Sequence, residues 1–558
     1  MQLDFRFENV TEEERGVFYE MLASDGDRSE LHLELHVEYT LQDRLGTRRP
    51  ILDFWGGSAK GTRIPPQVLE RLYHVHFDAL RDASWDLRPN RGNRLGQLLE
   101  KIEPDRDKQE AYASRLNRMV EEDHEWQRLV RRARSSVNEH LLRTTLAGDP
   151  MRVDMEFVSR DFSVFAESLR MVIPVFDPIQ KEALPKECTP DVIGKYFVCE
   201  TADRLRFKCD FLDELDHEQN EELHELLLEL CRQTARRFDV GQNGLGCNNL
   251  IYFATVLGDI GRRKAAEKGT YLALLVEEPE AHLHPQRQSV LFNYFKKWES
   301  EGIQSFITSH SPTITAKSDP DTVIVLSSHT GRVTAAAIRD TSLDAEDKSH
   351  LQKFLDVTRS QLFFARGVIL VEGISEALLM PVFARLVKPV FDLEHSGVEV
   401  VIVGGLAFKP FANLFRQQGA AVSVGGRCAI VTDDDRDKET TQHARNAQEL
   451  KQTGMVEVFL AECNLEYELY LWNEELVRSL YYQPTGLHPR TPPPNDDSID
   501  KRALSFSRKA RENDDKGDFA LRLAARLSED GCAAARFAVP DYLRRAVTWV
   551  ITGSDGPV

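Results

Sequence analysis

Short apolar runs that end in carboxylates recur along this chain and limit what it can fold into. Leu272–Val276 is followed by Glu277 and Glu278, and Val368–Val371 is followed by Glu372. A short apolar run is typical of a strand buried on both faces, as in the parallel sheets of α/β proteins. Because open α/β folds bind ligands at the carboxyl edge of the sheet, acids in that place are candidate site residues.

Composition and charge describe a chain large enough for several buried cores. It has 558 residues, of which 41% are hydrophobic and 29% charged, so we expect about three or four domains. The net charge of −19 (71 Lys and Arg against 90 Asp and Glu) argues against a protein that coats DNA or an anionic membrane by bulk charge, but permits a local basic groove. No signal peptide, membrane span or CxxC pair is found, so we expect a cytoplasmic protein with reduced core cysteines.

Periodicity separates extended from helical segments. Residues 30–41 alternate polar and apolar side chains, which is typical of a strand with one solvent-facing side. From Pro65 to about Leu146, and again over 221–237, the pattern predicts helices, and we interpret the basic stretch Arg128–Arg134 mainly as a solvated helix face. Strand and helix patterns alternate again from Gly367, which predicts a second α/β domain.

A predicted strand at 303–308 completes the first acidic constellation. It ends in Thr308, Ser309 and His310, where a histidine would sense the γ-phosphate of a nucleotide. One of the two preceding acids, Glu277 and Glu278, would hold Mg²⁺ on the nucleotide while the other polarises the attacking water. Each feature is common by itself, but the ordered set is specific.

This ordered set resembles the ATPase head of the ABC class, in the branch shared by structural-maintenance and recombination-type proteins. The resemblance implies that Glu277 is the Walker B metal acid, Glu278 the catalytic glutamate and His310 the switch histidine. It also assigns the D-loop to 280–285 and the signature loop to 241–246, with Gly244 and Gly246 as nucleotide-binding residues.

Three features depart from that family. Glu277 stands where aspartate is usual, and Asn243 stands near where a serine is expected. No G-x-x-x-x-G-K-[ST] phosphate loop occurs in the chain, and the cluster at 56–62 lacks its spacing. In the family that loop precedes the segment with which this chain opens. We therefore expect a missing N-terminal piece, through a misplaced start, a truncation or true loss, and ATP is a candidate cofactor without one of its expected binding elements.

The second constellation gathers acids at the edge of the later α/β unit. The first strand ends in Glu372, with a glycine turn and Glu376 after it, and the run from Arg427 ends in Asp433 and Asp435. Such carboxylates repel one another unless a hard cation neutralises them, and Mg²⁺ prefers oxygen ligands.

Further along the chain, Glu466 and Glu468 are two residues apart, and Lys516 lies in a polar turn. Together with VEGxxE and DxD, these residues resemble a TOPRIM domain, the metal-binding fold of topoisomerases, primases and certain nucleases. An ABC head followed by TOPRIM resembles the overcoming-lysogenization-defect (OLD) family of ATP-dependent nucleases, relatives of which serve in phage defence. Segments 76–89 and 351–366 support this resemblance.

The resemblance implies a two-metal nuclease site that uses Mg²⁺ or Mn²⁺. It assigns the principal ion to Glu372, Asp433 and Asp435, and a second ion to Glu376 and Glu466. Lys516 would neutralise charge on the scissile phosphate. One ion would activate water and the other would stabilise the departing 3′ oxygen, so no protein nucleophile is needed. Glu468 and Asp434 are less secure, and only proximity would make Tyr467 a nucleophile.

The sequence thus predicts an α/β protein in which an ABC/SMC-like ATPase head with a helical insertion precedes a TOPRIM domain. The expected boundaries are 1–64 for the remainder of the first lobe of the head, 65–235 for the helical insertion and dimerisation region with some strands, 236–345 for the second lobe, 346–366 for a connector, 367–530 for TOPRIM and 531–558 for a C-terminal tail.

The leading hypothesis is a metal-dependent DNA endonuclease governed by the head, in phage defence or DNA repair, acting as a homodimer or higher homo-oligomer. A helicase is a candidate partner, and no membrane is involved. The DNA groove would use Arg490, Lys501, Arg502, Arg508, Lys509 and Arg511. The alternatives are a non-cleaving DNA-binding scaffold with a degenerate head, and a recombination mediator that loads other proteins on DNA.

Overall fold

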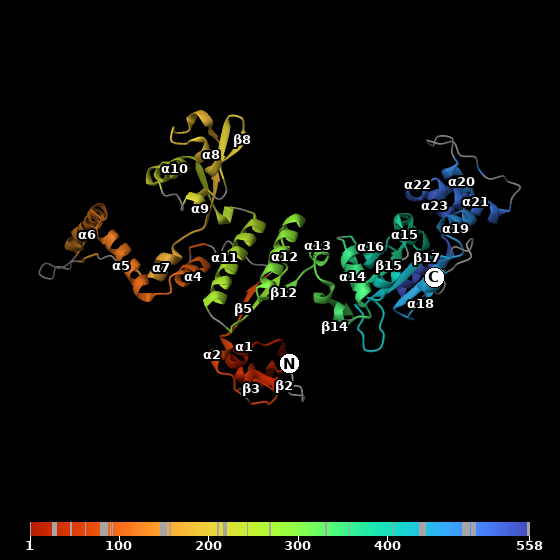
Figure 1. The fold of residues 1–558 in the computed structure, drawn as a ribbon, viewed down its shortest axis with the longest axis horizontal. Coiled ribbons are helices and arrows are strands. Elements are labelled where there is room, and N and C mark those ends of the chain that lie inside the picture. The colour runs from red at the N-terminus through yellow and green to blue at the C-terminus, as the bar shows by residue number, and fades with distance from the viewer. Residues whose placement is uncertain are drawn as a thin grey trace. The chain divides into compact units, whose positions relative to one another are not determined.

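Two compact units make up the chain in the computed structural model (Figure 1). The first comprises Met1–His284 and Phe295–Thr308, and the second Pro285–Tyr294 and Ser309–Val558. All residues are described except 1, 25–30, 45–46, 62, 79–87, 90, 92, 145–152, 156–157, 209–210, 216–219, 243, 267–268, 330–331, 357, 406, 435–441, 483–491, 493–497 and 555–558. None of the described helices combines the length and the apolar character needed to cross a membrane.

An antiparallel sheet opens the first unit. β3 (Leu31–Arg44) pairs with β1 (Gln2–Phe7), β2 (Leu22–Ser24) and β4 (Thr47–Gly56), so the strand predicted at 30–41 is confirmed. Apolar side chains of β3, of the segment that contains α1 (Glu12–Val17) and of the segment after β4 form a small core of Val10, Phe18, Met21, Leu33 and Ile64.

A parallel sheet of three strands lies at the centre of the first unit, in the order β12 (Gln304–Thr308), β11 (Tyr271–Glu277) and β5 (Leu72–Phe77). The strands predicted at 271–276 and 303–308 are confirmed. The helical prediction from Pro65 onward is wrong over 72–77, because this segment pairs with β11 and directs Phe77 against Phe253 of α11 (Leu245–Ala266), with ring centroids 4.6 Å apart.

Helices and two small sheets fill the interval between β5 and α11. The helices are α4 (Arg94–Ile102), α5 (Arg106–Glu122), α6 (His124–Thr144), α7 (Phe162–Glu167), α8 (Pro190–Tyr196), α9 (Phe211–Leu215) and α10 (Glu221–Thr234). β7 (Ile179–Gln180), β9 (Arg204–Phe207) and β8 (Phe197–Thr201) form one sheet, and β10 (Ala235–Asp239) pairs with β6 (Val172–Phe176). The helix predicted over 221–237 therefore ends earlier, where the chain enters β10.

A four-stranded parallel sheet forms the centre of the second unit, in the order β16 (Val398–Ile402), β15 (Gly367–Val371), β17 (Arg427–Asp433) and β18 (Val456–Ala461). Alternate residues of its strands enter two different cores. Ile369 and Val431 belong to one core, and Leu370 and Ile430 to the other. The sheet is therefore buried on both faces, which explains why its strands are continuous apolar runs.

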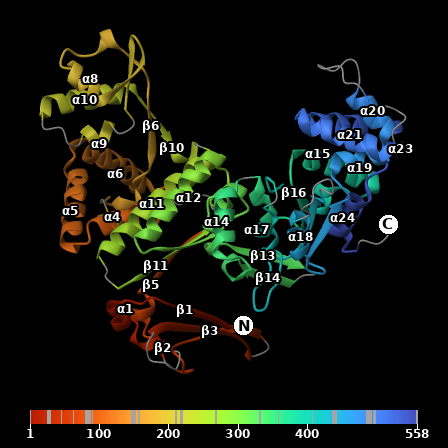
Figure 2. The ribbon, with the colours of Figure 1, turned by 45° about the vertical axis from the view of Figure 1, so that its right-hand side comes forward.

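Helices cover both faces of this sheet (Figure 2). One core takes side chains from α15 (Ile374–Val387), α19 (Leu465–Trp472), α20 (Glu474–Tyr481), α21 (Ile499–Glu512), α22 (Lys516–Glu529) and α24 (Asp541–Thr552). The other takes side chains from α14 (Ala345–Phe354), α17 (Phe408–Ala412) and α18 (Gln442–Glu449). The hairpin of β13 (Ile324–His329) and β14 (Arg332–Ala337) precedes them.

Two predicted accessory segments are parts of this packed unit. The expected connector at 346–366 contributes the buried Leu351 and Leu362 to one core. The expected tail at 531–558 contains α24, whose Leu543 and Val547 are buried in the other core, so the prediction of a tail is wrong. The sequence pattern did not indicate the sheet on which this amphipathic helix packs.

The cysteines agree only in part with the prediction of reduced core residues. The seven described cysteines are free, and Cys188, Cys231, Cys428 and Cys463 are buried. Cys199 and Cys532, however, are exposed.

Candidate functional site

Four carboxylates gather at the carboxyl edge of the four-stranded sheet, and we call them the acidic edge. Glu372 follows β15, Asp433 ends β17, Glu376 lies in the first turn of α15 and Glu466 in the first turn of α19. Because β15 and β17 are parallel neighbours, their ends meet at the same edge of the sheet. The predicted fifth carboxylate, Asp435, lies outside the described residues.

The carboxylates of the acidic edge shift one another's pKa values, although no three of these described residues place ligand atoms within 4.8 Å of one another. Burial raises the pKa of Asp433 well above its usual value, and the negative charges of Glu372, Glu466 and Glu376 raise it further. Burial, with Glu466 and Glu372, also raises the pKa of Glu376. The ionised acids therefore destabilise one another, as expected for oxygen ligands that bind a cation.

Glu372 is fixed across the two central strands. Its Oε1 accepts a hydrogen bond from the backbone N–H of Asp433, with an N···O distance of 3.1 Å, and another from the hydroxyl of Thr432. The end of β17 thus orients the carboxylate that follows β15.

Lys516 supplies a positive charge beside the acids. Its Nζ lies 3.0 Å from Oε2 of Glu466, whose residue is only 2% exposed. Burial lowers the pKa of Lys516, but the charges of Glu466 and Asp433 outweigh this effect and leave it raised. Lys516 begins helix α22 instead of lying in an irregular turn, so the helix fixes its position.

The hydrogen bonds at the start of α19 position Glu466. The side chain of Asn464 caps the helix by accepting from the N–H of Tyr467 at 3.0 Å, and it also accepts from Ser507 of α21 at 2.8 Å. Asparagine is a favoured N-cap residue and acids are common in the first turn of a helix, so Asn464 followed by Glu466 is the signal that could have placed Glu466 on a helix.

Glu468 and Tyr467 have structural partners. The carboxylate of Glu468 accepts from the backbone N–H of Glu462 at 2.8 Å and from Nε1 of Trp472 at 3.0 Å. Residues two apart on a helix are separated by about 200°, so Glu466 and Glu468 point to different sides of α19. Burial and a hydrogen bond to Asp500 raise the pKa of Tyr467 to about 12, which disfavours its phenolate as a nucleophile.

The residues of the first constellation are divided between the two units. Glu277 ends β11, and Glu278 follows it with a left-handed φ of 41° while its N–H donates to the carbonyl of Thr308 at 2.9 Å. His310 belongs to the second unit.

The predicted signature loop leads into the long helix α11. Gly244 precedes this helix and Gly246 lies in its first turn. A Cβ on Gly246 would lie 2.4 Å from the carbonyl oxygen of His282, so the loop and the predicted D-loop segment are tightly packed. Asn243 lies outside the described residues.

The predicted basic groove loses one of its members. Arg502 makes two hydrogen bonds to the carboxylate of Glu474, each 2.7 Å long, so it has a structural partner. Lys509 lies over the ring of Tyr482, while Lys501, Arg508 and Arg511 are exposed on α21. Arg490 lies outside the described residues.

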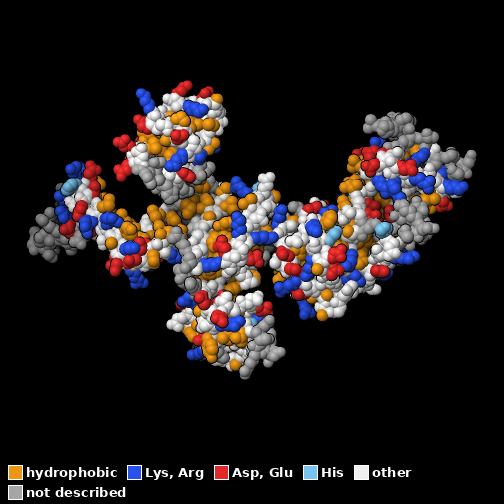
Figure 3. All heavy atoms as spheres, viewed as in Figure 1, with side chains coloured by type: hydrophobic (Ala, Val, Ile, Leu, Met, Phe, Trp, Pro, Cys, Tyr) orange, Lys and Arg blue, Asp and Glu red, His pale blue; other side chains and the backbone are white. Residues whose placement is uncertain are grey.

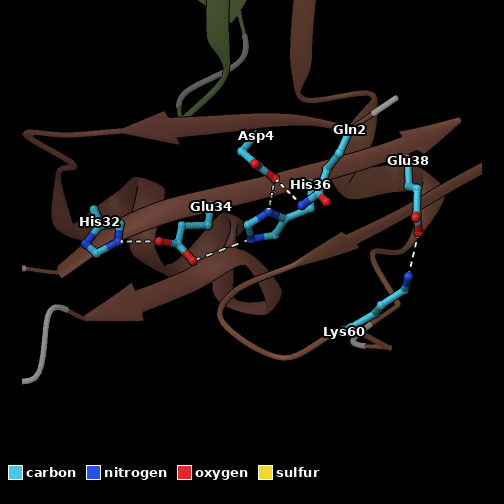
Figure 4. Close-up of polar contacts among 7 residues, drawn as sticks. All are labelled: Gln2, Asp4, His32, Glu34, His36, Glu38 and Lys60. Carbon is cyan, nitrogen blue, oxygen red and sulfur yellow. Dashed lines mark hydrogen bonds and ion pairs between the residues drawn. The ribbon is translucent and has the colours of Figure 1, made fainter.

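A histidine–carboxylate network on β3 was not predicted (Figure 4). His32 contacts Glu34 at 2.9 Å, Glu34 contacts His36 at 3.5 Å, and Nδ1 of His36 lies 2.6 Å from Asp4 of β1. The ring of His36 also stacks on Trp55, with centroids 5.2 Å apart. The signal for this network was the spacing of two between His32, Glu34 and His36, which places them on one face of the strand.

Comparisons with known proteins agree with this architecture. Residues 201–315 match the model of an AAA ATPase domain, and residues 363–435 match that of the overcoming lysogenization defect protein-like TOPRIM domain. The chain is 28% identical over 167 residues to the uncharacterized protein YbjD of Escherichia coli (strain K12). This match covers 30% of this chain and 29% of that protein. It is 23% identical over 203 residues to the Old nuclease of Escherichia phage P2. This match covers 35% of this chain and 34% of that protein. The chain thus spans about a third of the length of these relatives.

Two solved structures are similar to part of the chain. The C-terminal region of the Xanthomonas campestris pv. campestris OLD protein is 22% identical, with a TM-score of 0.23, and the match covers 35% of this chain and 95% of that one. The C-terminal region of the Burkholderia pseudomallei OLD protein is 25% identical, with a TM-score of 0.25, and the match covers 34% and 97%.

An AAA ATPase domain is therefore followed in this chain by an OLD-like TOPRIM domain. This order of domains supports a nuclease, and the matched residues 363–435 contain β15, β16 and β17 together with Glu372, Glu376 and Asp433.

Proposed function

We propose that this protein is a metal-dependent DNA endonuclease that hydrolyses phosphodiester bonds at the acidic edge of its TOPRIM domain. The observation that carries the proposal is the convergence of four carboxylates and Lys516 at the carboxyl end of one parallel sheet. The domain order and the similarity to the Old nuclease of phage P2 support it.

The donor set fits Mg²⁺ or Mn²⁺, because it consists of carboxylate oxygens whose charges repel one another when no cation is bound. The principal ion would be held by Glu372, Asp433 and Asp435, and a second by Glu376 and Glu466. When bound, such ions polarise the phosphate and lower the pKa of water.

The chain's own groups position these ligands and the substrate. Thr432 and the backbone of Asp433 orient Glu372. Glu466 holds the ammonium of Lys516, which would face the negative charge that develops on the scissile phosphate. The exposed Lys501 and Arg508 of α21 would contact the DNA backbone.

The AAA ATPase domain would govern cleavage. In this proposal Glu277 and Glu278 act on a nucleotide bound near Gly244 and Gly246, and His310 responds to its γ-phosphate. Self-association would use exposed apolar side chains of α5 and α6, namely Tyr112, Leu116, Met119, Trp126 and Leu129. Hydrophobic patches are visible over the segment from α5 to α7 (Figure 3). Roles in phage defence or DNA repair, with a helicase partner, belong to the same proposal.

Cleavage of supercoiled plasmid by the full chain with Mg²⁺ or Mn²⁺, without ATP, tests the nuclease. We expect metal-dependent nicking that Glu372→Gln and Asp433→Asn abolish. Glu529→Gln, at an exposed acid of α22, is the matched control and should cut normally. If the folded wild-type chain does not cut with either metal, whether ATP is absent or added, the nuclease proposal fails, and the non-cleaving scaffold or recombination mediator is favoured.

A further inference from the structure

The first unit contains a second group of metal-ligand side chains. His76 and Asp78 come from the end of β5, and Glu277 comes from the end of β11. One ligand atom from each residue lies within 4.8 Å of the other two, and among the described residues no other set of three His, Cys, Asp or Glu side chains meets this condition.

The register of the sheet brings these three side chains together. Phe77 lies beside Val276, and both are buried, with exposures of 0% and 1%. Side chains alternate along a strand, so the neighbours His76, Asp78 and Glu277 point to the opposite face. The structure places this convergence at the carboxyl edge of the sheet, where His76 and Asp78 are exposed.

We propose that His76, Asp78 and Glu277 form a binding site for a divalent transition-metal ion, with Mn²⁺ and Zn²⁺ as the fitting class. One imidazole nitrogen and two carboxylates suit such ions, whereas Mg²⁺ prefers oxygen ligands alone. In this site His76 and Asp78 join Glu277, which was proposed above to act on a bound nucleotide. The three side chains bind the ion without a phosphate ligand, so the site does not depend on a phosphate loop.

The geometry needs little change to accept the ion. Nε2 of His76 lies 2.9 Å from Oε1 of Glu277. Two ligands about 2.0–2.2 Å from a common metal ion are themselves separated by about 3.0–3.4 Å. The ion would replace the hydrogen bond between these atoms, and a proton held on Nε2 would pass to solvent. The side chains of His76 and Glu277 are 46% and 43% exposed, so an ion reaches them directly from water.

Electrostatics favours the same occupant. Asp78 and Glu277 place two carboxylates next to each other, and a divalent cation between them neutralises both charges. A nitrogen ligand also distinguishes this site from the acidic edge, whose proposed ligands are all oxygens.

Pulsed electron paramagnetic resonance of the full chain loaded with Mn²⁺ alone tests the proposal. We expect ¹⁴N modulation from a coordinated imidazole, and we expect His76→Gln to abolish it. Asp78→Asn should weaken binding of this ion by about tenfold or more. His74→Gln is the matched control, because His74 is exposed on the same strand and the same face but is outside the group, and it should keep the signal.

The wild-type spectrum and the His76 variant decide the outcome. Absence of ¹⁴N modulation in the wild type, or its persistence in His76→Gln, would mean that His76 and Glu277 form only a hydrogen bond. Glu372→Gln and Asp433→Asn separate this inference from the proposed nuclease, since they should abolish cleavage and leave the nitrogen signal unchanged.

Discussion

An ion pair joins Lys516 and Glu466, two residues that lie 50 positions apart in the sequence. Glu466 is buried, and Lys516 is its charge partner. The pair holds the ammonium where the charge of Asp433 also acts on it. Lys516 is therefore a candidate for contact with the phosphate, and Glu466 orients it.

Replacing Lys516 by methionine should lower plasmid cleavage by about 100-fold or more, because one preorganised positive charge is removed from the site. Lys516→Arg should retain more activity than Lys516→Met. Arg522→Met is the control, since Arg522 lies on the same helix, is exposed and pairs with Asp518. Equal cleavage by Lys516→Met and the wild-type chain would exclude a catalytic role for the lysine.

Asp433→Asn should stabilise the metal-free chain while abolishing its response to metal. Burial and three neighbouring acids raise the pKa of Asp433, so its ionised form at neutral pH destabilises the fold, and a neutral amide relieves this repulsion. In EDTA we expect a higher Tm for the variant, by about 2–4 °C for each kcal/mol gained. In excess Mg²⁺ the wild-type chain should have the higher Tm. A lower Tm for the variant in EDTA would show that Asp433 is not under charge strain.

At the scale of an element, the raised pKa of His36 predicts that the stability of β3 depends on pH. The hydrogen bond to Asp4 is the main reason that the pKa of His36 is raised, and Glu34 adds to it against the opposing effect of burial. A histidine whose pKa is raised in the folded state stabilises the fold when it is protonated. This stabilisation is fully present below its pKa in the unfolded state, about 6.5, and is lost as pH rises through its pKa in the folded state.

The amides of β1 and β3 should therefore exchange hydrogen faster, after correction for intrinsic rates, as pH rises from about 6 to about 8. His36→Asn should remove most of this dependence, and His74→Gln should leave it intact. Hydrogen-exchange mass spectrometry of peptides covering residues 2–7 and 31–44 measures it. A pH-independent wild type would contradict this role for His36.

Helix α21 separates two kinds of basic residue that the sequence alone did not distinguish. Lys501 and Arg508 are exposed, whereas Arg502 is held by Glu474. Lys501→Gln and Arg508→Gln should each weaken DNA binding and lower the slope of log K against log salt by about 0.9. Arg502→Gln should leave that slope unchanged and lower the Tm of the chain, because Glu474 loses its partner. A slope altered only in Arg502→Gln would reverse this assignment.

At the scale of the whole molecule, the chain consists of two compact units with separate cores. Calorimetry should therefore show two unfolding transitions, and a substitution in one unit should shift only one of them.

Gly426→Ala is a probe of the second unit. Gly426 has a left-handed φ of 81°, and a Cβ there would lie 2.8 Å from the carbonyl oxygen of Arg366. Strain of this kind costs about 1–3 kcal/mol, so one transition should move down by several degrees. Gly531→Ala is the control, since a Cβ at that position meets open space. A single transition that shifts as a whole would show that the two units unfold together.

The sequence by itself determined the strands whose apolar runs are buried and the acids that end them. Tyr271–Glu277 and Gly367–Val371 lie within one residue of the predicted apolar runs, and β17 begins at Arg427, as predicted. These elements are predictable because the apolar run, its length and the acid that ends it are local properties. The order of an ATPase head and a TOPRIM domain followed from the same local motifs.

Only the tertiary structure decided which distant residues meet. β5 became a strand because it pairs with β11, and this pairing brings His76 to Glu277 across 201 positions. The start of α19 directs Glu466 to Lys516 and Glu468 into structural hydrogen bonds. These outcomes depend on the order and register of strands and on helix packing, which arise from contacts between segments far apart in the chain and leave no local pattern in the sequence.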